Sequence, residues 1–118
     1  MEARAATPAQ RLLAIFDVFG EWFARDDFEG CSFINVMLEL VDPGSPVRRE
    51  SVRQLSEIRG FIGGLAKEAG VQDADAFARQ WHILMKGCIV AAAEGDRQAG
   101  VRARELGALL LSHHGITP

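Results

Sequence analysis

Apolar and polar positions alternate with a helical period in the first part of the chain. Between residues 7 and 27 the apolar residues recur at steps of three and four, the spacing of one face of an α-helix. Thr7 followed by Pro8 is a start signal, because threonine caps a helix and proline suits its first turn. We therefore predict an amphipathic helix that ends near Asp26 and Asp27. Its apolar face is formed by Leu12, Ile15, Phe16, Phe19, Trp22 and Phe23.

Four further apolar segments follow, and turn-forming residues separate them. The first is short enough to be a buried strand or a buried helix, and helix is favoured because no other strand pattern exists for it to pair with. The next contains Gly60, Gly63 and Gly64, which either allow close packing or mark a flexible turn. The segments run from Cys31 to about Val41, from Ser45-Pro46 to Gly70, from Asp73 to Glu94 and from Asp96 to about His114. The connections are short, so we predict an all-α fold of about five roughly antiparallel helices in one domain, residues 1–118.

The segment from Asp73 to Glu94 is apolar around most of its circumference. At 100° per residue its apolar positions cover about 260°, whereas a surface helix needs only about 100°. Such a helix is either the core helix of a monomer or part of a two-fold interface, and we favour a four-helix bundle made by the last two helices of two copies. The expected interface residues are Gly87, Val90, Ala91, Ala99, Ala103, Leu106, Leu109, Leu110 and His113.

Large aromatic and sulfur-containing side chains are numerous for so small a core. They are either core residues or the lining of a pocket, because ligand pockets are lined mostly by apolar groups with a few polar ones that orient the ligand. The apolar lining of such a pocket would be Phe19, Trp22, Phe23, Phe33, Met37, Trp81 and Met85. Its polar contributors would be Cys31, Asn35 and His82.

The charge pattern does not favour nucleic-acid binding. Lys and Arg number 13 against 16 Asp and Glu, which gives a net charge of −3. The arginines between Arg48 and Arg59 alternate with Glu50 and Glu57, which is more typical of a solvated helix face than of a phosphate-binding patch. No leader or membrane-spanning stretch stands out, so a cytoplasmic protein is expected.

Catalytic and metal-binding patterns are weak. His113 and His114 lie about 100° apart on a helix, so they do not share a face as paired metal ligands do. His82 has no carboxylate or thiol one turn away, and the two cysteines do not have the spacing of a metal site. We expect neither an enzyme nor a cofactor or metal site.

Taken in order, several segments resemble the C-terminal domain of TetR/AcrR-type transcriptional regulators. The most specific is Gly30-Cys31-Ser32-Phe33-Ile34-Asn35 with Glu39 after it, which is similar to the "GCPFIN…E" segment of one branch of that family, with Ser32 where proline is common. The resemblance covers about Thr7 to His114. The other matching segments are residues 7–17, 21–23, 42–43, 46–48 and 87–96.

The resemblance implies a homodimer whose C-terminal domain holds a mostly hydrophobic effector pocket. In the family an N-terminal helix-turn-helix binds operator DNA, and effector binding releases it. That helix-turn-helix would come before Ala5, so this chain is expected to lack it and not to bind DNA directly. The expected function is the regulatory domain of a repressor that binds a small apolar or amphipathic effector and dimerises. The alternative is a homo- or heterodimerisation module without a ligand.

Overall fold

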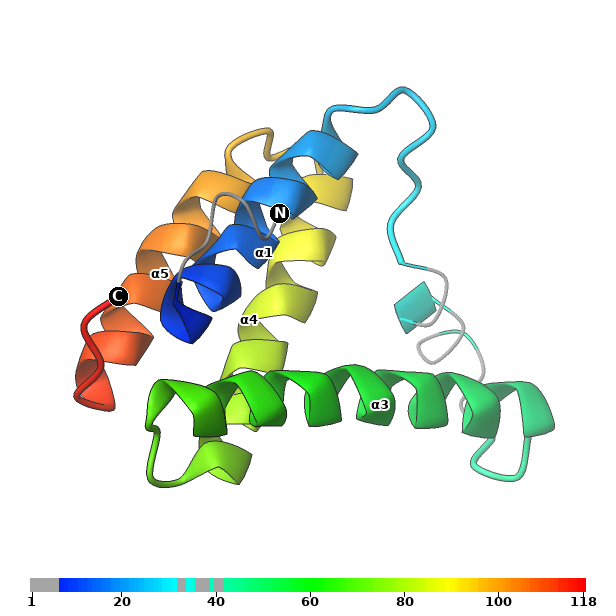
Figure 1. Ribbon diagram of the computed structural model, residues 1–118. Helices are drawn as coiled ribbons and strands as arrows, with labels where there is room; N and C mark the ends of the chain where they lie inside the picture. The colour runs from blue at the N-terminus through cyan, green and yellow to red at the C-terminus, as the bar shows by residue number, and fades with distance from the viewer. Residues whose placement is uncertain (1–6, 32–33, 36–38, 40–41) are drawn as a thin grey trace.

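The structure of the protein is a computed structural model, which describes residues 7–31, 34–35, 39 and 42–118. These residues form helices and the turns between them (Figure 1). Ile34, Asn35 and Glu39 are also helical, between the first two bounded helices. The prediction of an all-α fold is confirmed. The bounded helices are α1 (Pro8–Phe23), α3 (Pro46–Ala69), α4 (Ala74–Ala93) and α5 (Ala99–His113).

Three helices begin within a residue of the positions that the sequence indicated, and each has a side-chain cap. The Thr7 hydroxyl accepts a hydrogen bond from the Gln10 backbone N–H (3.1 Å), while the Gln10 side chain accepts one from the Thr7 backbone (3.3 Å). This reciprocal pair satisfies two N–H groups that the first turn of α1 leaves without helical partners. The Ser45 hydroxyl caps α3 by accepting a hydrogen bond from the Arg48 backbone N–H. The Asp73 carboxylate caps α4 by accepting one from the Ala76 backbone N–H. Local capping chemistry therefore sets these three starts.

The last helix begins later than predicted. Asp96 does not cap it: its carboxylate accepts a hydrogen bond from the Gln98 backbone N–H (2.9 Å) within the turn that precedes α5. Gly95, at a φ of 109°, turns the chain after α4, and the cap position of α5 is Gln98, which makes no side-chain cap bond. The first helix also ends earlier than predicted, at Phe23 rather than near Asp26.

The main core lies where α4 meets the other helices. α1, α4 and α5 lie side by side, and α3 runs across one end of them (Figure 1). Trp81 of α4 is fully buried, stacked on Phe77 (ring centroids 5.2 Å apart) and tilted against Phe16 of α1 (5.3 Å). The other large side chains that are completely covered are Leu12 of α1, Ile62 of α3 and Leu111 of α5. All four helices therefore contribute to one core.

Two glycines of α5 allow its close approach to α1 and α4. A Cβ atom added at Gly100 would lie 2.9 Å from the Phe16 carbonyl oxygen and 3.2 Å from the Gly20 Cα atom. One added at Gly107 would lie 2.7 Å from the Cη2 atom of Trp81. Neither space admits a side chain, so these contacts fix the separation between α5 and its neighbours.

The glycines of α3 behave differently. The helix is continuous through all three, so none of them marks a turn. A Cβ atom at Gly63 would be 3.8 Å from the Ala78 Cβ atom, an ordinary contact between α3 and α4. At Gly60 and Gly64 an added Cβ atom would meet nothing within 4 Å.

Candidate functional site

The aromatic residues at the end of α1 form a cluster with the segment that follows. Trp22 lies edge-on to Phe28, and Phe23 also contacts Phe28, each with ring centroids 5.0 Å apart. The Phe19 ring contacts the rings of both Trp22 and Phe23, with centroids 5.8 Å apart in each pair. Together with Cys31 these partly buried rings pack against a small second core of Ile34, Leu55 and Ile89. The structure thus brings together four of the predicted pocket residues: Phe19, Trp22, Phe23 and Cys31.

Trp81 and Met85, predicted to line the same pocket, belong to the main core instead. Trp81 is covered by Phe16, Phe77 and the glycine face of α5. Phe33 and Met37 lie outside the described residues. Asn35 is exposed, and its side chain donates a hydrogen bond to the Glu29 carbonyl oxygen (3.4 Å).

His82 is a buried histidine whose ring makes few polar contacts. Only 2% of the residue is exposed, and its Nδ1 atom has no hydrogen-bond partner among the described residues. Burial lowers the pKa of His82 from 6.5 to about 4, helped by the positive charges of Lys86 and Arg59. The imidazole is therefore neutral at pH 7, and one ring nitrogen can still bond to a polar group.

An apolar hollow lies between α1 and α3. It has a volume of about 640 Å³. Phe61 projects into solvent beside it with 62% of its surface exposed. Sequence reasoning missed this groove except for Phe19, although Phe61 lies outside the buried stripe of its helix and could have signalled it. The residues that line it are Arg11, Ile15, Val18 and Phe19 of α1 and Phe61, Gly64, Leu65 and Glu68 of α3.

A second apolar surface runs along α4 and α5. Ile83 on α4 and Leu109 on α5 are each 67% exposed, and Leu106 is about half exposed. The predicted interface residues Gly87, Val90 and His113 are exposed too, while Ala91 and Leu110 are partly covered. We call Ile83, Gly87, Val90, Leu106 and Leu109 the α4/α5 face. Ile83 is an addition to the predicted set.

Ala99 and Ala103 of the predicted set differ from the other members in their burial. Both are buried in the core of the single chain, on the side of α5 that also carries Gly100 and Gly107. Their small side chains serve the packing of α5 within its own chain, so they are not counted in the α4/α5 face.

Other kinds of site find little support in the described structure. Within residues 7–31, 34–35, 39 and 42–118, no three His, Cys, Asp or Glu side chains gather closely enough to hold a metal ion. Burial raises the pKa of the Cys88 thiol to about 11, so it is protonated at pH 7. No helix in this part of the chain is both long enough and apolar enough to cross a membrane.

Comparison with known proteins matches both the sequence and the fold. Residues 8–106 match the family described as Tetracyclin repressor-like, C-terminal domain. The HTH-type transcriptional regulator YjdC of Escherichia coli K12 is 29% identical over 83 residues, which is 70% of this chain and 44% of that protein. The protein of the same name from Shigella flexneri gives the same values.

A crystal structure provides the match in fold. It is of a protein from Streptomyces avermitilis assigned as a TetR transcriptional regulator, and it superposes with a TM-score of 0.85 at 26% identity. The superposition covers 94% of this chain and 61% of the other. This chain therefore spans less than half the length of the curated relatives and about three fifths of the solved one.

Proposed function

The chain belongs to the tetracycline-repressor-like C-terminal domain family, and from that premise we propose that it binds a small apolar or amphipathic effector and dimerises. The groove between α1 and α3 carries the first half of this proposal. Its volume of about 640 Å³ lies within the range of about 300–1,000 Å³ typical of small-molecule sites. Its lining is mostly aliphatic and aromatic, which suits an organic ligand with little polar surface.

Two charged residues of the groove lining define the expected orientation of the effector. Arg11 lies one turn from Ile15 on α1, and Glu68 lies near the end of α3. A ligand with an apolar body would contact Val18 and Phe61, and a polar end would meet one of these charged groups. Phe19 connects the groove to the aromatic cluster, because its ring also contacts Trp22.

Trp22 makes the effector proposal testable by fluorescence. We propose titrating the chain with Nile red, a neutral apolar dye, and reading both dye emission and tryptophan emission. Saturable binding with a change in Trp22 emission is expected, and it should persist in a Trp81→Phe variant if Trp22 is the reporter. Phe61→Ala should weaken binding by about tenfold, since it removes a large contact surface.

The matched control for Phe61 is Val47→Ala, because Val47 is an exposed apolar residue at the other end of α3, away from the groove. This variant should bind the dye as the wild type does. If Phe61→Ala and Val47→Ala bind equally well, the groove is not the effector site.

The α4/α5 face supports the second half of the proposal. Exposed leucine and isoleucine side chains on two adjacent helices form an apolar surface of the kind that two-fold symmetric dimers bury. Gly87 lies among them and would let the backbones of two copies approach closely. We propose that a second copy packs on this face and forms a four-helix bundle.

Analytical ultracentrifugation tests dimerisation. The wild type should sediment as a dimer, and Leu109→Arg should shift it to monomer because two charges would be buried across the symmetry axis. Val47→Arg adds the same charge on α3, and it should leave the dimer intact. A monomeric wild type at all concentrations would exclude this half of the proposal.

A dimerisation module without an effector is the second candidate, and the filled core around Trp81 favours it. In that case mixing with a full-length relative should give heterodimers, while Nile red binding would be absent. For either function we propose that operator DNA is bound by the part of the related regulators that this chain does not match. A mobility-shift titration should accordingly give no specific DNA complex.

A further inference from the structure

A second groove lies between α3 and α4 and differs in character from the first. Its volume is about 400 Å³, and its lining is mainly polar. Gly64 borders both grooves, so α3 separates an apolar hollow on one side from a polar one on the other. The lining residues that the argument uses are Arg59, Gly63 and Lys67 of α3 and Ala74, Asp75 and Arg79 of α4.

The charged groups in this groove do not balance. Arg59, Lys67 and Arg79 bring three positive charges, against the carboxylate of Asp75 in the lining and that of Asp73 at the rim. The Asp75 carboxylate is used by Arg79, whose Nε atom donates a hydrogen bond to it (3.2 Å). Arg59 and Lys67 have no ion pair with any residue that the structure describes. A protein with a net charge of −3 thus has a local excess of positive charge here.

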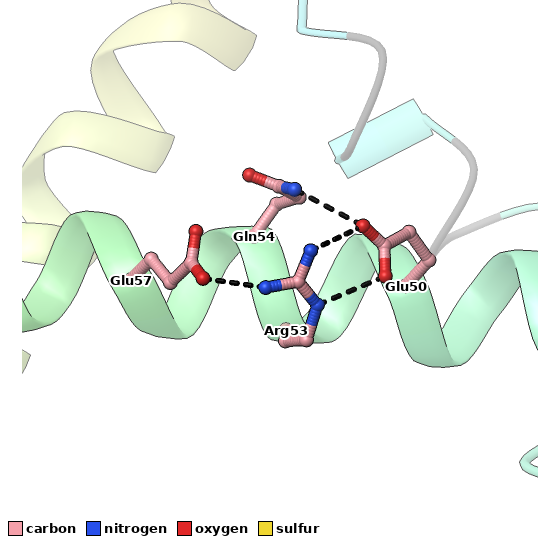
Figure 2. A network of polar contacts seen from close by, with 4 residues as sticks. All are labelled: Glu50, Arg53, Gln54 and Glu57. Carbon is pink, nitrogen blue, oxygen red and sulfur yellow. Dashed lines mark hydrogen bonds and ion pairs between the residues drawn. The ribbon is translucent and has the colours of Figure 1, made fainter.

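Arg53 shows what a neutralised arginine on the same helix looks like. Figure 2 shows its guanidinium between two carboxylates, with Nε and Nη2 donating to Glu50 and Nη1 donating to Glu57. The Arg53 guanidinium, together with the Gln54 amide, lowers the pKa of Glu50 to about 2. Arg53 and its two glutamates therefore form part of the solvated helix face that the sequence indicated. Arg59, less than two turns later, is half-buried and lacks such a partner.

The backbone leaves room for a ligand beside these cations. Gly63 and Ala78, where the two helices meet, leave only small groups at the base of the groove. At the rim, α4 begins at Ala74, and the Asp73 side chain accepts only the Ala76 N–H. The Ala74 and Asp75 N–H groups of the first turn lie at the positive end of the helix dipole, where anions are stabilised, beside the carboxylates of Asp73 and Asp75.

His82 gives an independent indication that a polar partner is missing. It lies one turn after Ala78 on α4 and is almost completely buried, with its Nδ1 atom without a partner in the described structure. A buried polar atom without a hydrogen bond is costly, and His82 lies on the same face of α4 as Ala74 and Ala78, which line the groove.

We propose that the α3/α4 groove binds the phosphate or carboxylate group of a small molecule, held by Arg59, Lys67 and the first N–H groups of α4. The two cations supply the charge, and the backbone N–H groups supply directional hydrogen bonds to the anion's oxygen atoms. This site does not depend on the apolar groove, because its charged residues lie on the opposite side of α3.

An amide chemical-shift titration of the isotope-labelled chain tests the proposal. Inorganic phosphate and acetate are added separately, with sodium chloride adjusted to hold the ionic strength constant. At least one of the two anions should give saturable shifts at Gly63, Ala74 and Asp75. The Arg59→Gln/Lys67→Gln double variant should weaken this binding by about tenfold or more.

Arg97→Gln is the matched control, because it removes an exposed positive charge from the turn at the other end of α4. It should leave anion binding unchanged. The double variant should in turn leave Nile red binding unchanged, which separates failure of this site from failure of the apolar groove. Non-saturable shifts with both anions would overturn the proposal. The proposal would also be overturned if a DNA duplex shifted the same amide signals at a lower concentration than either anion, because the ligand would then be a nucleic acid.

Discussion

Replacing Gly107 with alanine is the sharpest test of how α5 packs. The added methyl group would lie 2.7 Å from the Cη2 atom of Trp81 and 3.2 Å from the Cε2 atom of Phe16. Carbon atoms pack best at about 3.5–4.0 Å, so the ring or the helix must move by up to about 1 Å. Trp81 has little freedom to move, because it is fully buried and stacked on Phe77.

The expected magnitude follows from two opposing effects. Alanine is favoured over glycine inside a helix by about 1 kcal/mol, whereas overpacking a core costs about 1–3 kcal/mol. We expect Gly107→Ala to lower the free energy of unfolding by up to about 2 kcal/mol. Gly60→Ala is the matched control, because its methyl group would meet nothing within 4 Å. It should raise stability by about 1 kcal/mol.

Urea denaturation followed by circular dichroism, at one fixed protein concentration, measures both changes. The two variants should differ by about 1–3 kcal/mol, or about 4–12 °C in Tm, with similar m-values. If Gly107→Ala is as stable as Gly60→Ala, then α5 does not approach Trp81 as closely as described, and the packing argument fails.

Three further predictions concern single groups. Folding lowers the pKa of His82 from 6.5 to about 4, so between these pH values the unfolded chain binds more protons than the folded chain. The free energy of unfolding should therefore fall by at most about 3 kcal/mol as the pH decreases through this window. His82→Leu should remove that part of the pH dependence in urea titrations, and an unchanged slope would contradict it. Partly exposed Cys31 should react with a thiol reagent in the folded chain, whereas Cys88 should react only on unfolding, and equal rates would refute its burial. Thr7→Ala should lower stability by about 1 kcal/mol through loss of the α1 cap, measurable by thermal melting; an unchanged Tm would mean that the cap contributes nothing.

The sequence predicted best those features that neighbouring residues decide. Thr7, Ser45 and Asp73 cap helices through atoms three positions away, so the signal and its partner lie in one short segment. The start of α5 was missed because the carboxylate of Asp96 can serve a turn as well as a helix. Only the geometry after Gly95 decides between the two.

Features that depend on contacts between residues far apart in the sequence could not be predicted from neighbouring residues. A tryptophan on a helical stripe fits a core or a pocket equally well, and Trp81 is a core residue because Phe16 and Gly107 cover it from two other helices. Similarly, Phe61 borders a groove only because α1 lies beside it. The unpaired state of Arg59 is a third example: its sequence neighbours include glutamates, but these are held by Arg53.

The glycine contacts of α5 also determine how motion passes through the domain. At Gly100 the backbone of α5 rests on the backbone of α1, with no side chain between them that could change rotamer and absorb a displacement. We therefore expect α1 and α5 to move together. A shift of α1 by even a fraction of an ångström is transmitted to Leu106 and Leu109 at the far side of α5, so a wall of the apolar groove and the exposed α5 leucines move together.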